Sequence, residues 1–328
     1  MGIKKLLITR FSAMGDVAMC VPVVYSLAQK YKDLEIIFLS RKNFAPIFSQ
    51  LPENVKFIGI DLKNDYKGLS GLNRLFSEIK QLDIDAYADF HDVLRTKYLR
   101  IRALCAGIKT IKIDKGRSEK KRLTKNGATN CKPLKTTFVR YQDVLHKLGF
   151  NFELDFPKTK KTEKSGKIGI APFAAHKGKI LPLETTEEVV KMLSEKGLQI
   201  FLFGFGEKEK AVLEQWQDKY KNVTSLVGKS GGLKNELVLI SELDCMISMD
   251  SANMHLASLV GTRAVSVWGA THPAAGFFGF NQDETDAVQI PLPCRPCSIY
   301  GNKECRLKDK YQCLNKITAE MIVEKILK

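Results

Sequence analysis

A carboxylate follows the first apolar segment of this chain. Residues 5–10 read as a buried strand, and Gly15 and Asp16 follow it just before an apolar helical segment begins near Val17. Open α/β sheets bind their ligands at the carboxyl ends of their strands, so Asp16 is placed where a ligand would lie. The same pair also suits a plain turn, in which Gly15 relaxes the backbone and Asp16 caps the helix.

A second polar group follows an apolar strand predicted over residues 245–248. Asp250 and Ser251 stand between this strand and a helix that carries His255. Because helix N-termini attract phosphate groups, the start of this helix is a candidate anion site. The alternative for Asp250 is to cap the helix, and a lone helical histidine is more often structural than catalytic.

Four cysteines near the end of the chain have a spacing that suits a metal. They form a C-x2-C pair followed by two further cysteines, each after seven residues, so four thiolates could hold a structural zinc ion. Zinc sites of this kind usually contain two C-x2-C units, and free reduced thiols are the alternative. The four residues are Cys294, Cys297, Cys305 and Cys313.

The elements that must position these residues alternate between strands and helices. Such alternation is typical of parallel sheets with crossover helices. Expected strands are 5–10, 35–40, 55–60, 86–90, 168–172, 199–203, 223–226, 245–248 and 264–268, and expected helices are 17–31, 44–50, 72–81, 184–196, 207–220, 233–242 and 318–327.

The lysine-rich stretch 151–167 interrupts this alternation and reads as a linker. We therefore predict two doubly wound α/β domains, 1–160 and 161–328. Within the second, a glycine turn after residues 199–203 can bring Glu207 or Glu209 to a nucleotide ribose, although glycine turns after strands are common.

The composition of the chain limits the classes of protein to which it can belong. The 328 residues are 44% hydrophobic and 27% charged, as in globular proteins, and no apolar run has the length of a membrane span. We expect a cytoplasmic protein. The net charge of +16 favours anionic partners. Its densest basic run, residues 112–125, reads as a loop that is either a solvated surface or a patch facing a membrane or acceptor.

Four motifs, in order along nearly the whole chain, resemble those of the heptosyltransferases (glycosyltransferase family 9). The first is R-x-S-x-x-G-D, the second is D-x-H-G-x-x-R, the third is a lysine shortly before a proline, and the fourth is D-S/T-G-x-x-H. Asp92 and Ala252 replace the glycines of the second and fourth. The matching residues are Arg10, Ser12, Gly15, Asp16, Asp89, His91, Arg95, Lys179, Pro182, Asp250, Ser251 and His255.

The resemblance implies a GT-B fold, in which two Rossmann-like domains face a cleft. The N-terminal domain would bind the acceptor and the C-terminal domain the nucleotide sugar, with the final helix packing back towards the N-terminal domain. It also implies an inverting, metal-independent transferase that moves heptose from an ADP-activated donor to an anionic lipid-linked saccharide in lipopolysaccharide core assembly. Contact with the inner membrane face would then be peripheral, and any zinc would be structural.

Roles for single residues also follow from the resemblance. Asp16 would take the proton of the acceptor hydroxyl, and Lys179, with Lys177 as a neighbouring alternative, would stabilise the departing diphosphate. The expected donor-binding residues are Asp250, Ser251, Ala252, His255 and Glu207, and the expected acceptor-binding residues are Ser12, Gly15, His91 and Arg95.

Three other functions compete with this interpretation. A transferase of the same fold could use a different nucleotide sugar, and a catalytically silent relative could bind glycans. Nucleic-acid binding is disfavoured, because the basic residues are not interleaved with aromatic residues and no known nucleic-acid motif occurs.

Overall fold

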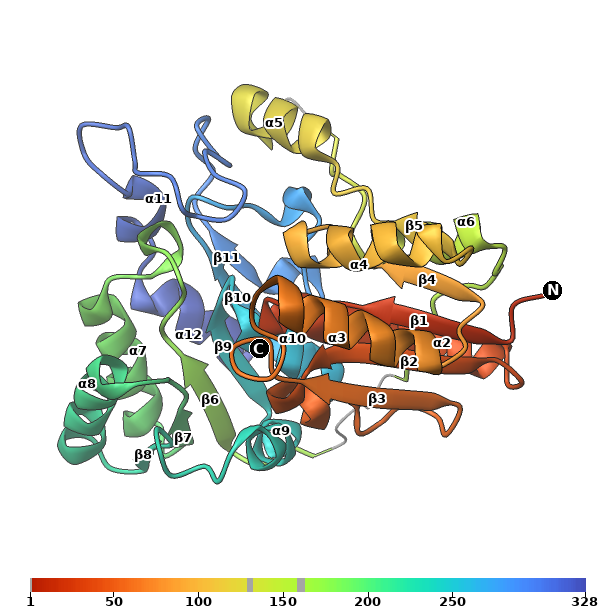
Figure 1. Cartoon of the computed structure of the whole chain (residues 1–328). Coiled ribbons are helices and arrows are strands. Elements are labelled where there is room, and N and C mark those ends of the chain that lie inside the picture. Colours follow the sequence, from red (N-terminus) through yellow and green to blue (C-terminus); the bar gives the residue numbers. More distant parts are fainter. Residues whose placement is uncertain (1, 129–131, 158–162) are drawn as a thin grey trace. The chain divides into compact units, whose positions relative to one another are not determined.

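The chain forms two compact units, each built on its own parallel sheet (Figure 1). The computed structural model describes residues 2–128, 132–157 and 163–328. The first unit comprises residues 1–115 and 137–157, and the second comprises residues 116–136 and 158–328. Both sheets are covered by helices, which is the expected α/β architecture of two Rossmann-like domains.

The first sheet has five strands in the order β3-β2-β1-β4-β5, and its described strand pairs are all parallel. Its central strand is buried on both sides, with Leu6, Leu7 and Ile8 fully inaccessible, as parallel sheets require. The elements of this unit are β1 (Lys5–Thr9), α1 (Met14–Ala18), α2 (Cys20–Lys30), β2 (Glu35–Arg41), η1 (Lys42–Phe48), β3 (Val55–Ile60), α3 (Gly68–Gln81), β4 (Ala86–Asp89), α4 (Leu94–Cys105), β5 (Lys109–Lys112) and α6 (Thr137–Leu148).

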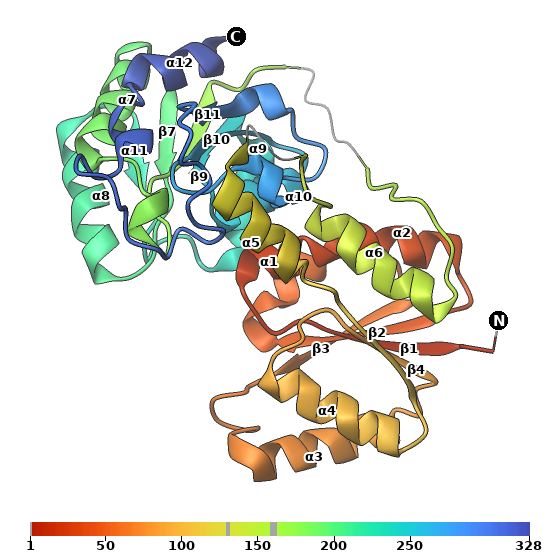
Figure 2. The ribbon, with the colours of Figure 1, turned by 90° about the horizontal axis from the view of Figure 1, so that it is seen from above.

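Helices α3 and α4 lie side by side on one face of this sheet, as Figure 2 shows. In α3, Leu72, Leu75, Phe76 and Ile79 recur at helical spacing and enter the core formed with Leu7 of β1. Helices α2 and α6 contact one another on the other face. Helices therefore cover both faces of this sheet.

The second sheet has six strands in the order β11-β10-β9-β6-β7-β8, again with parallel pairing throughout the described pairs. The elements of this unit are α5 (Arg117–Asn126), β6 (Lys167–Ala171), η3 (Lys177–Lys179), α7 (Leu183–Glu195), β7 (Gln199–Leu202), α8 (Glu207–Lys219), β8 (Val223–Ser225), α9 (Leu233–Glu242), β9 (Cys245–Met249), α10 (Ala252–Leu259), β10 (Arg263–Trp268), η4 (Pro273–Ala275), η5 (Glu284–Asp286), β11 (Ala287–Gln289), α11 (Gln312–Asn315) and α12 (Ala319–Leu327).

The predicted domain boundary at residue 160 assigns one segment to a different unit from the structure. Residues 116–136 belong to the second unit, where Ala128 N donates to Arg295 O and Leu134 N to Ala274 O. The basic run expected to be a loop contains the end of β5 and helix α5. Part of the predicted linker, residues 151–157, belongs to the first unit, and residues 158–162 lie outside the described residues.

The C-terminal helix α12 packs on its own unit. It contacts α7 and β10, and Ile322, Val323 and Ile326 enter the core of the second sheet. These contacts lie within the second unit, and packing of the helix towards the first domain stays a prediction. None of the helices in the described part of the chain combines the length and the apolarity needed to span a membrane.

Candidate active site

The first group of predicted residues gathers where the strand order of the first sheet reverses. Strand β1 lies between β2 and β4, and the chain leaves β1 and β4 at the same edge of the sheet. The short helix α1, which follows β1, carries Asp16, and the loop after β4 carries His91. A switch point of this kind is where open α/β sheets bind their ligands.

Asp16 is held by a buried arginine. Its Oδ2 lies 2.6 Å from Arg10 Nη2 and accepts a hydrogen bond of 3.2 Å from Ala13 N. Arg10 also donates to Phe90 O at 2.8 Å, which ties together the segments that follow β1 and β4. Among the described residues no hydrogen bond or ion pair engages Asp16 Oδ1, and the side chain is 28% exposed. The carboxylate is therefore oriented through one oxygen and open at the other.

Arg10 supplies a permanent positive charge beside this carboxylate. Burial alone would lower the pKa of its guanidinium, but Tyr141, Asp16 and Cys20 raise the pKa above its ordinary value overall. Tyr141 also donates from its hydroxyl to Asp16 O at 3.2 Å and stacks on Phe90. Sequence reasoning missed this tyrosine, because it comes from α6, far along the chain.

His91 is a neutral structural partner of the segment after β1. It is buried, and burial together with the charges of Arg10 and Lys115 lowers its pKa to about 3. Phe11 N donates to its Nδ1 at 3.4 Å, so a neutral ring has its proton on Nε2, which lies 3.3 Å from Ser12 Oγ. His91 thus holds Phe11 and Ser12 in the segment that leads from β1 into α1, where Asp16 lies.

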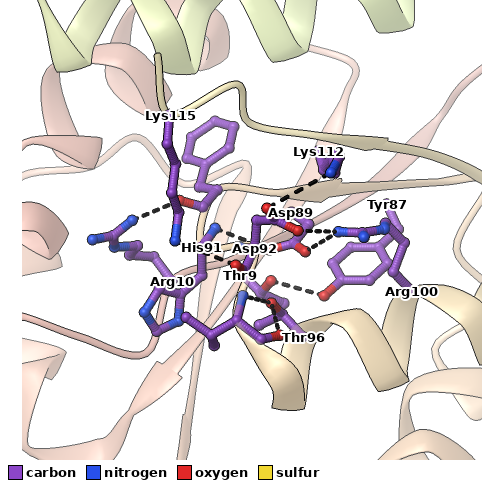
Figure 3. A network of polar contacts seen from close by, with 12 residues as sticks. Thr9, Arg10, Tyr87, Asp89, His91, Asp92, Thr96, Arg100, Lys112 and Lys115 are labelled. Atoms are coloured by element: carbon purple, nitrogen blue, oxygen red, sulfur yellow. Dashed lines mark hydrogen bonds and ion pairs between the residues drawn. The ribbon is translucent and has the colours of Figure 1, made fainter. Parts of the chain in front are cut away.

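A fully buried carboxylate organises the loop after β4. Asp89 Oδ1 accepts hydrogen bonds from His91 N at 2.9 Å and Asp92 N at 2.8 Å, and its Oδ2 lies 2.6 Å from Arg100 Nη1 (Figure 3). Arg100 also lies 3.2 Å from Asp92 Oδ1. Sequence reasoning missed Arg100, although Asp89 itself was part of the matched motif.

Asp92, which replaces the glycine of the second motif, has a backbone conformation that suits glycine. Its φ is 45°, in the left-handed region that glycine adopts most readily and that aspartate tolerates better than most residues. Lys112 Nζ lies 3.7 Å from its carboxylate, and Lys115 Nζ donates to its carbonyl oxygen at 3.3 Å. The substitution therefore keeps the turn and adds a charge that nearby lysines neutralise.

Two further predicted acceptor residues are placed differently. Gly15 is buried within α1, whereas Arg95 is exposed in the first turn of α4. Arg95 forms no hydrogen bond or ion pair with any described residue. The structure therefore brings Ser12, Asp16 and His91 together and leaves Arg95 at the margin.

The second group gathers at the corresponding switch point of the second sheet, between β6 and β9. Lys179 Nζ lies 2.9 Å from Asp250 Oδ2, and the two side chains are 17% and 6% exposed. Lys177, the alternative cation, is exposed. The structure therefore selects Lys179 as the partner of Asp250.

Close backbone packing positions Lys179. A Cβ atom added at Gly178 would lie 2.9 Å from both Ala270 Cβ and Gly301 O, and one at Gly301 would collide with the Lys179 stem. Gly178 O also accepts a hydrogen bond of 2.8 Å from Ala270 N. These two glycines are further positioning residues that the sequence did not single out.

Helix α10 begins directly after Asp250. Ser251 occupies its N-cap position in an extended conformation but forms no side-chain cap, and its hydroxyl instead lies 3.1 Å from Ser248 Oγ. The first turn, which starts with Ala252, thus has amide groups that no side-chain cap satisfies. His255 is buried on this helix.

Glu207 is not part of this cluster. It begins α8 after β7, the strand beside β6, and its side chain is 91% exposed with Lys210 at 3.9 Å. Glu209 instead closes the preceding turn by accepting a hydrogen bond of 2.7 Å from Phe205 N. A ribose contact by Glu207 stays a prediction.

The cysteine segment is organised by an arginine. Arg295 is buried and donates to the carbonyl oxygens of Trp268, Gly269, Thr271 and Ile290 and to the side chain of Gln289. Burial raises the pKa of Cys313 to about 11, and burial also raises that of Cys297.

No three His, Cys, Asp or Glu side chains are arranged to hold a metal ion within residues 2–128, 132–157 and 163–328. All four cysteines of the predicted zinc site lie within these ranges, and none forms a disulfide. Zinc binding at this segment therefore finds no preformed cluster and stays a prediction.

A surface groove in the first unit lies apart from these residues. Its volume is about 630 Å³, and α2 and residues 151–155 line it. None of the predicted site residues contributes to its walls. The candidate functional residues are therefore the polar clusters at the two switch points, each described within its own unit, and this groove is not among them.

Comparison with known proteins gives one consistent family. Residues 132–308 match glycosyltransferase family 9 (heptosyltransferase). The chain is 24% identical over 293 residues to lipopolysaccharide core heptosyltransferase OpsX of Haemophilus influenzae, covering 82% of this chain and 80% of that protein. It is 25% identical over 284 residues to lipopolysaccharide heptosyltransferase 3 of Escherichia coli, covering 78% and 80% respectively.

A solved structure has the same fold over almost the whole chain. It is the E. coli heptosyltransferase WaaC with ADP-2-deoxy-2-fluoro heptose, which is 17% identical. The TM-score is 0.68, and the alignment covers 98% of each chain. The matched family segment includes Lys179, Asp250 and the start of α10.

Proposed function

Because the chain belongs to glycosyltransferase family 9 (heptosyltransferase), we propose that it transfers a heptose or related sugar from an ADP-activated donor to a lipid-linked saccharide of the lipopolysaccharide core. The observation that carries this proposal is the Lys179–Asp250 ion pair, which lies at a switch point inside the matched family segment. Relatives named as lipopolysaccharide heptosyltransferases support the acceptor class.

The second unit would bind the donor. A departing diphosphate gains negative charge as the glycosidic bond breaks, so a fixed cation and unsatisfied amide groups lower the barrier. Lys179 has three N–H donors, and its ion pair with Asp250 leaves others for phosphate oxygens. The first turn of α10 supplies the amide groups and a favourable dipole. The proposed donor-binding residues are Asp250, Ser251, Ala252, His255 and Glu207.

The first unit would bind the acceptor and remove its proton. Asp16 Oδ1 is open while Oδ2 is held, so one carboxylate oxygen can accept the hydroxyl proton as the hydroxyl attacks the anomeric carbon. Attack from the side opposite the nucleotide inverts the configuration. His91 is neutral and engaged with the loop, which makes it a positioning residue. The proposed acceptor-binding residues are Ser12, Gly15, His91 and Arg95.

We also propose that transfer needs no metal, since Lys179 and the start of α10 already offer positive potential to the diphosphate. The reaction would take place in the cytoplasm, with peripheral contact at the inner membrane, because the acceptor is anchored in lipid. Any zinc held by the cysteine segment would then support structure alone.

Nucleotide-dependent thermal stabilisation tests the proposal directly. The purified chain is heated with ADP, UDP, GDP or CDP, each with and without EDTA. Selective stabilisation by ADP that survives EDTA is expected. Preference for another nucleotide would indicate a different donor, loss of the ADP effect with EDTA would contradict metal independence, and no response to any nucleotide would favour a silent glycan-binding relative.

A matched pair of variants tests the role of the cation. Lys179→Met is expected to lose most of the ADP effect, whereas Lys177→Met, which removes an exposed lysine of the same short helix, should retain it. The reverse result would move the diphosphate site to Lys177.

A further inference from the structure

Helix α4 carries an apolar stripe on its outer side. Thr96, Leu99 and Ala103 are its buried residues, and they pack it onto the first unit. Leu94, Ile101 and Leu104 are 84%, 59% and 63% exposed. Leu94 and Ile101 are two turns apart, and Leu104 lies one turn beyond Ile101, so the three share one side of the helix.

This stripe is unusual for the chain. The described residues include nine exposed large apolar side chains, and three of them belong to this one helix. Isolated exposed apolar residues are normal, whereas a row of them on a single helix marks an interaction surface. We call Leu94, Ile101 and Leu104 the outer stripe.

The charges of α4 are all positive. Residues 94–105 include Arg95, Lys97, Arg100 and Arg102 and contain no acidic residue. Arg100 is neutralised by Asp89 and Asp92, but Arg95 is exposed and has no partner among the described residues. Arg102 is also exposed, and its contacts are the neutral Asn73 and Tyr98 and the ring of Phe76.

The neighbouring helix α3 adds one exposed aliphatic side chain. Asn73 of α3 accepts a hydrogen bond from Arg102, so its side of α3 faces α4, and Figure 2 shows the two helices next to one another. Leu69 precedes Asn73 by one turn and is 67% exposed. A fourth aliphatic side chain thus lies on the helix that borders the outer stripe.

The position of α4 connects this surface with the reaction. The helix starts two residues after Asp92, in the loop that also carries His91. A lipid-linked acceptor has its saccharide and its lipid anchor in one molecule. A membrane contact immediately beside the acceptor loop would therefore keep the saccharide within reach.

We propose that α4 is the membrane-docking helix of this protein, with the outer stripe inserted among the acyl chains of an anionic leaflet and Arg95, Lys97 and Arg102 at its phosphates. An aliphatic stripe with cationic flanks is the pattern of helices that lie in a membrane interface. Positive charge without acidic residues fits anionic lipid headgroups. The biological purpose of this docking rests on the proposed function, since a soluble acceptor would not require it.

Vesicle co-sedimentation of the full chain tests the proposal. The vesicles consist of phosphatidylcholine alone or of phosphatidylcholine with phosphatidylglycerol, without donor or acceptor. We expect binding to the anionic vesicles that weakens as salt is added. The triple variant Leu94→Ser, Ile101→Ser, Leu104→Ser should lower the partition coefficient by about a hundredfold.

Matched variants distinguish binding through this surface from non-specific hydrophobic adsorption and from an effect of net charge. The apolar control carries the changes Val238→Ser, Leu307→Ser and Leu327→Ser, which also remove three exposed aliphatic side chains. The charge variant carries Lys97→Glu and Arg102→Glu, and its control carries Lys196→Glu and Lys234→Glu with the same change in net charge. Only the α4 variants should lose binding, and all should keep the ADP-dependent stabilisation of the parent chain.

Four outcomes would overturn the proposal: no vesicle binding, equal binding to both kinds of vesicle, undiminished binding of both α4 variants, or self-association of the parent chain that the triple variant abolishes. The last would show that the stripe pairs with a second copy. Because the vesicles carry no substrate, membrane binding is scored even if the donor proves different. Failure of the ADP response would count against the proposed function alone.

Discussion

Replacing Asp16 by asparagine separates the chemical role of this carboxylate from its structural role. Asparagine has nearly the same shape and keeps an oxygen that can accept from Arg10 and Ala13 N. The change removes the negative charge and the ability to take a proton. We expect turnover to collapse while the fold and ADP binding persist.

The structure sets the sizes of the two effects. The Arg10–Asp16 pair is 10% and 28% exposed, and charged hydrogen bonds of this kind contribute about 1.5–3 kcal/mol. Because asparagine retains an acceptor, the loss of unfolding free energy should be about 1–2 kcal/mol, small against a total of about 5–15 kcal/mol. Loss of a general base slows turnover about 10²–10⁴-fold, or about 3–5 kcal/mol in the activation barrier.

The assay measures the initial rate of ADP release with saturating donor and acceptor, alongside ADP-dependent thermal stabilisation. Asp33→Asn is the control, because Asp33 is an exposed carboxylate just before the amino end of β2, at the opposite edge of the sheet. A variant at Asp16 that binds ADP normally and loses less than about tenfold in rate would refute its role as the base.

Three further perturbations test the geometry. Arg295→Lys should cost about 3 kcal/mol of unfolding free energy in urea titrations, because lysine cannot satisfy the four carbonyl groups and the amide that the guanidinium reaches; an unchanged midpoint would contradict that network. The pKa of His91 is lowered to about 3 by burial, so below pH 6.5 the unfolded chain binds a proton that the folded chain excludes. Between pH 7 and 5 the parent chain should thus lose about 2 kcal/mol relative to His91→Asn, and parallel pH profiles would refute this. Gly178→Ala should cost about 1–3 kcal/mol and weaken ADP-dependent stabilisation, since the added methyl group forces the segment carrying Lys179 to move; retained ADP affinity would show that the close packing is dispensable.

The cysteine segment shows that residue spacing alone does not predict a metal site. Metal-like spacing places thiols near one another along the chain, but their geometry depends on how the loop folds around Arg295. Helix α5 shows a related limit. Its basic residues suggested a loop, yet Lys120 is buried with its ammonium group 4.4 Å from the centre of the Phe277 ring. Neither the contacts of Arg295 with this loop nor the contact of Lys120 with Phe277 can be recognised from neighbouring residues in the sequence.

The alternation of strands and helices, and with it two parallel sheets, could be predicted without the structure. Hydrophobic periodicity is local, so it survives without knowledge of the fold. The residue pattern also put Asp16, His91 and Asp250 just after predicted strands, and the motif resemblance singled out Lys179. Because open sheets bind ligands at the carboxyl ends of their strands, these residues could be proposed as a candidate site before any distance was known.

Which of these residues meet, and with what geometry, depends on how the strands are ordered in the folded chain. The strand orders bring β1 beside β4 and β6 beside β9, and so create the two switch points from segments far apart in the chain. The folded chain also pairs Arg10 with Asp16 within the segment after β1, pairs Lys179 with Asp250 across β6 and β9, and leaves Glu207 exposed. The outer stripe of α4 likewise emerged only from exposure, because sequence alone cannot tell a leucine that packs on the sheet from one that faces outward. Long-range packing determines which side chains are buried and which form ion pairs. Burial and ion pairing in turn determine the charge state of each side chain and the groups it can contact.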